Sequence, residues 1–154
     1  MSVVSSKRSP WIKRVLIAGL VLLLAGAVAI YFIFTEKFTD TSKKDAAFTV
    51  NAMDFLREFQ KSDSLANKKY AEQIITVRGR VTETEAADTT INIKMIDTAT
   101  AAYIIFAFQQ QHLAEAKQLK AGDSVSIKGS CSGGTYSDIL ETEFVTFKRC
   151  AITK

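Results

Sequence analysis

The longest apolar stretch of the chain covers residues 15–34, which are uncharged and mostly aliphatic. A helix of this length is about 30 Å long, which matches the hydrocarbon core of a bilayer. The stretch therefore predicts one transmembrane helix. It divides the chain into a flank (residues 1–14), the span, a tether (residues 35–48) and a domain (residues 49–154).

The flank before the predicted span is basic, and no acidic residue occurs before residue 35. Positively charged flanks stay in the cytoplasm, so we expect a single-pass protein of the inner membrane with a cytoplasmic N-terminus and a periplasmic domain. A cleaved signal peptide is the alternative, because small residues precede a cut after Ala29. The basic residues of the flank are Lys7, Arg8, Lys13 and Arg14.

Polar residues without periodicity fill residues 35–48, a composition that is typical of a flexible tether. Apolar residues then recur at helical spacing after Asn51, which is a favourable residue for the N-cap of a helix. This pattern predicts a helix over residues 52–61 and a shorter helical segment over residues 65–70.

From residue 75 the spacing of apolar positions changes to two, the pattern of half-buried strands. Five strands are predicted, with a helix over residues 112–119 between the third and the fourth. This order is that of a five-stranded Greek-key OB-fold, so the expected fold class is mainly β, a barrel with flanking helices. The five predicted strands cover residues 75–81, 89–96, 101–108, 124–130 and 144–152.

Three segments and two cysteines carry a resemblance to a known family. They are ANKKY at residues 66–70, ITVRGRV at 75–81, LKAGDSVSIKG at 119–129, Cys131 and Cys150. In these features the chain resembles the tRNA-anticodon-like OB-fold family, small membrane-anchored proteins typical of Bacteroidetes. The resemblance implies an OB-fold and, by analogy of fold, nucleic-acid binding. It carries over no catalytic residue.

The net charge of +4 does not belong to the domain. The bases of the flank account for it, since residues 35–154 contain 16 bases and 16 acids. A neutral domain attracts a phosphate backbone only weakly. The two loops that OB-folds use for binding are also acidic in this chain. Their acidic residues are Glu83, Glu85, Asp88, Asp138, Glu141 and Glu143.

Five residues are candidates for ligand binding. Arg78, Arg80 and Lys94 alternate along predicted strands, and Tyr103 and Tyr136 offer rings for stacking. A solvated strand face produces the same alternation. We expect a non-catalytic binding module for an envelope protein or ligand, with single-stranded nucleic acid as the alternative partner.

Cys131 and Cys150 are the only cysteines, and a periplasmic location favours a disulfide between them. Two unpaired thiols are the alternative for a cytosolic domain. The single histidine, His112, suits a solvated helix position better than catalysis. No metal-binding spacing occurs, so we expect no enzyme activity, no cofactor and no metal site, with calcium at the acidic loops as the weaker alternative.

Overall fold

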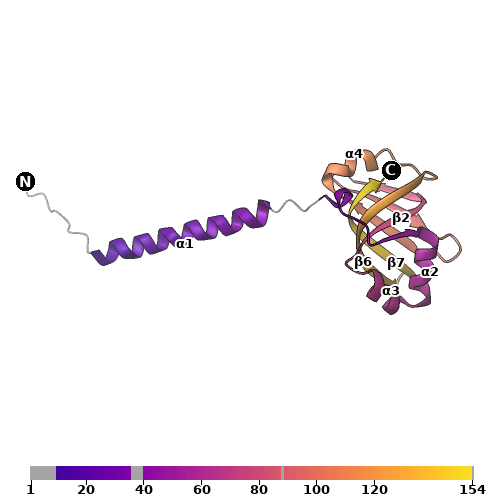
Figure 1. Ribbon diagram of the computed structural model, residues 1–154, viewed down its shortest axis with the longest axis horizontal. Helices are drawn as coiled ribbons and strands as arrows, with labels where there is room; N and C mark the ends of the chain where they lie inside the picture. Colours follow the sequence, from indigo (N-terminus) through magenta and orange to yellow (C-terminus); the bar gives the residue numbers. More distant parts are fainter. Residues whose placement is uncertain (1–9, 36–39, 88, 154) are drawn as a thin grey trace, which may run out of the picture. The chain divides into compact units, whose positions relative to one another are not determined.

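The computed structural model describes residues 10–35, 40–87 and 89–153. The chain divides into two compact units, Met1–Phe38 and Thr39–Lys154, which are drawn in Figure 1. Lys7 and Arg8 of the predicted basic flank, and Asp88 of the first acidic loop, lie outside the described residues.

The described residues of the first unit form one helix, α1 (Pro10–Thr35), whose first turns hold Lys13 and Arg14. Pro10 begins the helix, a position where the missing backbone N–H of proline costs nothing. Residues Pro10–Ile33 are long and apolar enough to cross a membrane, and a signal sequence has the same length and composition. The predicted apolar helix is therefore present, and it begins earlier than residue 15.

The second unit is mainly β, as predicted. Its seven strands form one sheet in the order β1-β2-β6-β7-β5-β4-β3, in which only the pairs β1–β2 and β5–β7 are parallel. The hydrogen-bonded ladder has two ends, β1 and β3, so the predicted five-stranded Greek-key barrel is not confirmed. The strands are β1 (Phe48–Asn51), β2 (Ile74–Arg80), β3 (Glu83–Ala86), β4 (Ile91–Ile96), β5 (Tyr103–Phe108), β6 (Ser124–Ser137) and β7 (Thr142–Thr153).

Helices α2 (Ala52–Lys61) and α3 (Asp63–Tyr70) pack on the sheet. The side chain of Asn51 accepts a hydrogen bond from the backbone N–H of Met53 at 3.0 Å, which confirms the predicted N-cap. The apolar side of α2 is buried, and its Phe55 ring lies 5.7 Å from the ring of Phe147 in β7. The spacing of apolar residues therefore predicted this helix with its bounds.

Two polar or glycine-rich segments form strands that the sequence did not predict. The four residues of β3 are all exposed and pair with β4, and β6 continues to Ser137 instead of ending near residue 130. The Asn67 side-chain amide holds this extension, because it donates to the Gly134 carbonyl at 2.9 Å and accepts from its N–H at 2.8 Å. Helix α4 (Leu113–Ala116) is shorter than predicted and follows the 3-10 helix η2 (Gln110–His112).

The second half of the predicted tether is part of the folded unit. The 3-10 helix η1 (Thr41–Lys43) begins at Asp40, whose carboxylate accepts from the Ser42 N–H at 2.9 Å. The ammonium of Lys128 in β6 donates to the carbonyls of Ser42, at 3.3 Å, and of Lys44, at 2.9 Å. These contacts hold η1 against the sheet from Asp40 onward.

Cys131 and Cys150 are free and fully buried, so the predicted disulfide is not supported. The two cysteines lie on paired strands, but Cys131 is the register partner of Phe147, and Cys150 lies three positions farther along β7, beyond a register shift. Burial raises the pKa of the Cys131 thiol to about 11 and raises the pKa of Cys150 well above its usual value. Both side chains therefore remain protonated thiols at neutral pH.

Candidate ligand-binding surfaces

The outward side of β4, β5 and β7 forms a half-buried surface that we call the aromatic face. Alternate residues of these strands point into the core, which leaves their neighbours on the opposite side. Tyr103 and Phe144 are register partners, and their rings stack at 5.7 Å with an angle of 14° between the ring planes. The face consists of Lys94, Ile96, Tyr103, Ile105 and Phe144.

Two carboxylates neutralise the only charge of the aromatic face. Lys94 forms ion pairs with Glu83, at 3.5 Å, and with Glu85. The hydrogen bond that Lys94 donates to the Glu85 carboxylate raises the pKa of Lys94 above its usual value. The Lys94 ammonium also lies 5.9 Å from the centre of the Tyr103 ring. A phosphate at this position would have to replace two carboxylates that are already bound.

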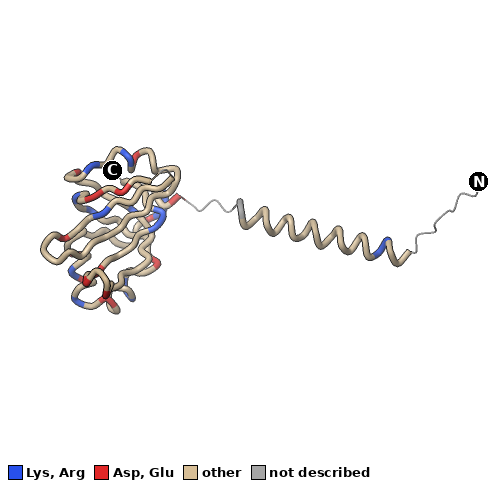
Figure 2. Tube along the Cα trace, turned by 180° about the vertical axis from the view of Figure 1, so that it is seen from behind, with Lys and Arg blue, Asp and Glu red and all other residues tan. Residues whose placement is uncertain are grey.

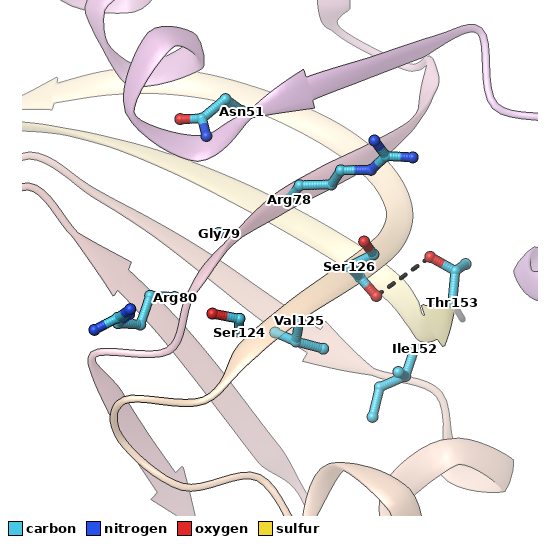
Figure 3. Close-up of a pocket in the computed structure, with 9 residues that line it drawn as sticks. All are labelled: Asn51, Arg78, Gly79, Arg80, Ser124, Val125, Ser126, Ile152 and Thr153. Atoms are coloured by element: carbon cyan, nitrogen blue, oxygen red, sulfur yellow. Dashed lines mark hydrogen bonds between the residues drawn. The ribbon is translucent and has the colours of Figure 1, made fainter.

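Arg78 and Arg80 belong to a different surface. Both are exposed on β2, where their register partners are Ser126 and Ser124 of β6. Sequence analysis grouped these arginines with Lys94 as binding candidates, but Lys94 contacts β3 and Tyr103 instead. Figure 3 shows the arginines among the residues that line a groove beside the paired strands β2 and β6. The groove is lined by Asn51, Arg78, Gly79, Arg80, Ser124, Val125, Ser126, Ile152 and Thr153.

Tyr136, the last predicted candidate, lies near the tip of the β6–β7 hairpin and is 51% exposed. Its register partner Glu143 is buried, although the sequence suggested an acidic loop residue. Ile139 and Leu140 at the tip are exposed, at 93% and 60%. Sequence reasoning missed this apolar tip and also Phe144, because neither belongs to a charged or aromatic motif.

His112 joins the start of η1 to the rest of the domain. Its Nε2 lies 2.9 Å from the Asp40 carboxylate, and its Nδ1 lies 3.9 Å from that of Glu115. The contact with His112 holds the pKa of Asp40 well below its usual range. His112 is therefore a partly buried, paired residue and not the solvated helix residue that we predicted. Within residues 10–35, 40–87 and 89–153, no three His, Cys, Asp or Glu side chains group as metal ligands would.

Basic and acidic residues are interspersed over the domain, as Figure 2 shows. In the figure, blue and red positions occur on most of the strands and loops that are visible. This distribution agrees with the equal number of bases and acids in residues 35–154. Any selectivity for an anion must therefore come from a local cluster of bases.

Comparison with known proteins gives a family and a shared fold. The family model tRNA_anti-like matches residues 7–142. The crystal structure of a candidate nucleic acid-binding lipoprotein from Klebsiella pneumoniae subsp. pneumoniae has a TM-score of 0.54 at 18% identity, and the match covers 68% of this chain and 91% of that one. A comparison with curated protein sequences finds no match.

Two synthetase structures are also similar to part of the chain. An aspartyl-tRNA synthetase from Entamoeba histolytica has a TM-score of 0.41 at 13% identity, and the match covers 55% of this chain and 19% of that one. A candidate aspartyl-tRNA synthetase from Leishmania major has a TM-score of 0.45 at 10% identity, with 74% and 22% covered. The chain thus spans about a fifth of the length of either synthetase.

Proposed function

Because the chain belongs to the tRNA_anti-like family, we propose that its folded unit is a non-catalytic binding module of the OB type, anchored to a membrane by α1. The module takes its ligand on the aromatic face. OB-folds bind ligands on the face of their second and third strands, and these strands correspond here to β4 and β5. The stacked pair of Tyr103 and Phe144 on this face is the observation that carries the proposal.

In an OB barrel of this kind, β2 and β3 would be two halves of one bent strand. Only Val81 and Thr82 separate them, and Thr82 donates its N–H to the carbonyl of Lys94 in β4 at 2.9 Å. Since β2 pairs with β6 and β3 pairs with β4, a strand that bends between them would join the two sides of the sheet. This reading supports an OB barrel of five strands, to which β1 is added at one edge.

The charge of the aromatic face favours a ligand without strong negative charge. Lys94 is already neutralised by Glu83 and Glu85, whereas stacking and apolar contacts remain open at Tyr103 and Ile105. A segment of an envelope protein satisfies these conditions. It would contribute apolar and aromatic side chains and needs no compensating charge.

Single-stranded nucleic acid is the second candidate ligand. Stacked aromatic rings with a nearby ammonium group, as in Tyr103, Phe144 and Lys94, favour it, because bases stack on such rings in many OB-folds. The absence of a local excess of positive charge on this face counts against it.

Site-specific photo-crosslinking in cells tests the first candidate. A photoreactive phenylalanine analogue at Ile105 should give a discrete adduct with one protein, whereas the same analogue at the exposed Lys117 should not. Tyr103→Ala and Phe144→Ala should each remove the adduct. An adduct that persists in both variants would contradict binding on the aromatic face.

Fluorescence anisotropy with labelled oligonucleotides tests the second candidate. Full-length protein in dodecyl maltoside should bind them weakly or not at all. Binding that weakens with added salt and is lost in Tyr103→Ala would replace the first candidate with the second.

The proposed anchor predicts where the domain lies in the cell. Full-length protein should stay with the membrane fraction after alkaline carbonate extraction. In spheroplasts, external protease should remove the domain and leave a fragment that contains α1. A mature chain that begins after Ala29 would instead identify the apolar helix as a cleaved signal sequence.

A further inference from the structure

Arg78 and Arg80 are two cations that have no counter-ion among the residues that the structure describes. They are two positions apart on β2, so their side chains leave the same face of the strand. Both are exposed, and no described residue forms a hydrogen bond or ion pair with either guanidinium group. By contrast, Lys94 and Arg57 are each paired with carboxylates. The two arginines therefore hold unused donors.

The walls of the groove around Arg78 and Arg80 contain hydrogen-bond donors. Among the described residues, neither a glutamate nor an aspartate lines this groove or the adjoining cavity, which shares Asn51, Gly79 and Arg80 with it. The hydroxyl groups of Ser124 and Ser126 make no hydrogen bond with the described residues and lie on the strand opposite the arginines. The volume of the groove, about 600 Å³, accommodates a small phosphorylated ligand.

The N-terminus of α2 adds positive potential at the same place. At the point where the helix begins, Asn51 lines both cavities and Ala52 lines the adjoining one, and helix N-termini attract anions. Gly79 allows this approach, because a Cβ there would lie only 2.8 Å from the Cβ of Ala52. The acid in the first turn, Asp54, is occupied by Arg57 at 3.2 Å.

We propose that this arginine groove is an anion site for a ligand that carries at least two phosphate-type groups. In Figure 3 the guanidinium groups of Arg78 and Arg80 extend toward different ends of the groove, and the serine side chains lie between them. A ligand with two anionic groups can engage both arginines at once. Guanidinium binds phosphate through two parallel hydrogen bonds, which favours phosphate over a point-like anion such as chloride.

The site differs from the aromatic face and does not depend on the function proposed there. A soluble diphosphate and the headgroup of an anionic phospholipid with two phosphates, such as cardiolipin, share the required chemistry. The experiment therefore has one arm for each source.

In the first arm, full-length protein in dodecyl maltoside is titrated with inorganic pyrophosphate in phosphate-free buffer by isothermal calorimetry. Arg78→Ala/Arg80→Ala should weaken binding by about a hundredfold, since each lost hydrogen bond to a charged group reduces affinity by about tenfold. Lys61→Ala/Lys68→Ala, a matched pair of exposed bases on α2 and α3, should change affinity less than about twofold.

In the second arm, native mass spectrometry counts the cardiolipin molecules, each with two phosphates, that remain bound to the same proteins. Arg78→Lys/Arg80→Lys keeps the charge and loses the paired hydrogen bonds, so it should give intermediate binding in whichever arm is positive. Near-UV circular dichroism verifies that each variant is folded.

Arginine-dependent pyrophosphate binding identifies a soluble ligand, and arginine-dependent lipid retention alone identifies a headgroup. Either result supports the site. Equal losses in the control variant, or no arginine-dependent binding in either arm, would overturn it. Salt-sensitive oligonucleotide binding that requires both arginines, in the absence of the other two signals, would also overturn it and would assign the groove to nucleic acid.

Discussion

Glu143 should make the domain less stable at neutral pH than the same protein with glutamine at this position. The residue is only 8% exposed, and its Oε1 has no hydrogen-bond partner among the described residues. Burial, and to a lesser degree the charge of Asp63, raises the pKa of Glu143. The fold therefore disfavours the ionised carboxylate.

The raised pKa of Glu143 determines how the stability of the domain changes with pH. Because the folded pKa lies above the unfolded value of about 4.3, the unfolded chain releases the proton first, and stability is lost as pH rises through this interval. At low pH both states carry the proton, and the penalty vanishes. An unpartnered buried polar group costs about 1–3 kcal/mol. We take the lower half of this range, since glutamine keeps one unpartnered polar group.

Glu143→Gln should therefore raise the melting temperature of the domain at about pH 8 by about 3–8 °C and leave it nearly unchanged at about pH 4. Near-UV circular dichroism of the full-length protein in dodecyl maltoside measures this transition. Glu141→Gln is the matched control, because this neighbour is exposed. Equal melting shifts of Glu143→Gln at both pH values, or a lower melting temperature at about pH 8, would refute the reasoning.

Three further predictions concern the packing of Gly79, the two thiols and the cap of η1. Gly79→Ala should destabilise the domain by about 1–3 kcal/mol in urea unfolding, since its Cβ would overlap Ala52; an unchanged midpoint would contradict this. Cys131 and Cys150 should resist maleimide in the native protein and both react after unfolding without reductant, whereas a disulfide would block both. Asp40→Asn should speed hydrogen exchange in η1. Because the pKa of Asp40 is lowered, the contacts of its carboxylate in the wild-type protein are fully present above about pH 4. They are lost as the pH falls through the pKa of Asp40 in the folded protein.

The sequence predicted the elements whose stability comes from their own apolar pattern. Helix α2 has both an N-cap and apolar residues at helical spacing, so local chemistry and tertiary burial favour the same structure. The strands that contribute alternate residues to the core were predicted for the same reason, with bounds that differ by a few residues.

The sequence did not predict elements that depend on pairing with distant segments. The residues of β3 have no buried side, so their pairing with β4, through backbone hydrogen bonds and the ion pairs with Lys94, makes them a strand. The extension of β6 depends on β7 and on the amide of Asn67, which is 67 positions away. Neither interaction leaves a periodic signal in the local sequence.

The sequence pointed to the kinds of residue that line the candidate surfaces, but not to which of these residues lie together. The alternation of Arg78, Arg80 and Lys94 does not reveal which strands are neighbours. In the structure, Lys94 faces the carboxylates of β3, and the arginines face serines of β6. The difference in their partners follows from which strands pair, since β2 pairs with β6 and β4 pairs with β3.

The pairing of Lys94 yields a last prediction, which separates the two candidate ligands of the aromatic face. Glu83→Gln/Glu85→Gln removes both counter-ions and leaves Lys94 beside the Tyr103 ring. If these carboxylates are what keeps nucleic acid from the face, the double variant should bind a labelled oligonucleotide about tenfold more tightly than wild type at low salt. Its affinity should also fall more steeply with salt, because one more phosphate contact increases the slope by about 0.7.

The matched control, Glu115→Gln/Glu141→Gln, changes the net charge equally at two exposed positions away from Lys94. An equal gain in the control would mean that total charge, and not the local pairing, limits binding. No gain in either variant would show that the rings of this face do not serve as a stacking platform for bases, which leaves a protein segment as the ligand that the stacked rings and the neutral charge both favour.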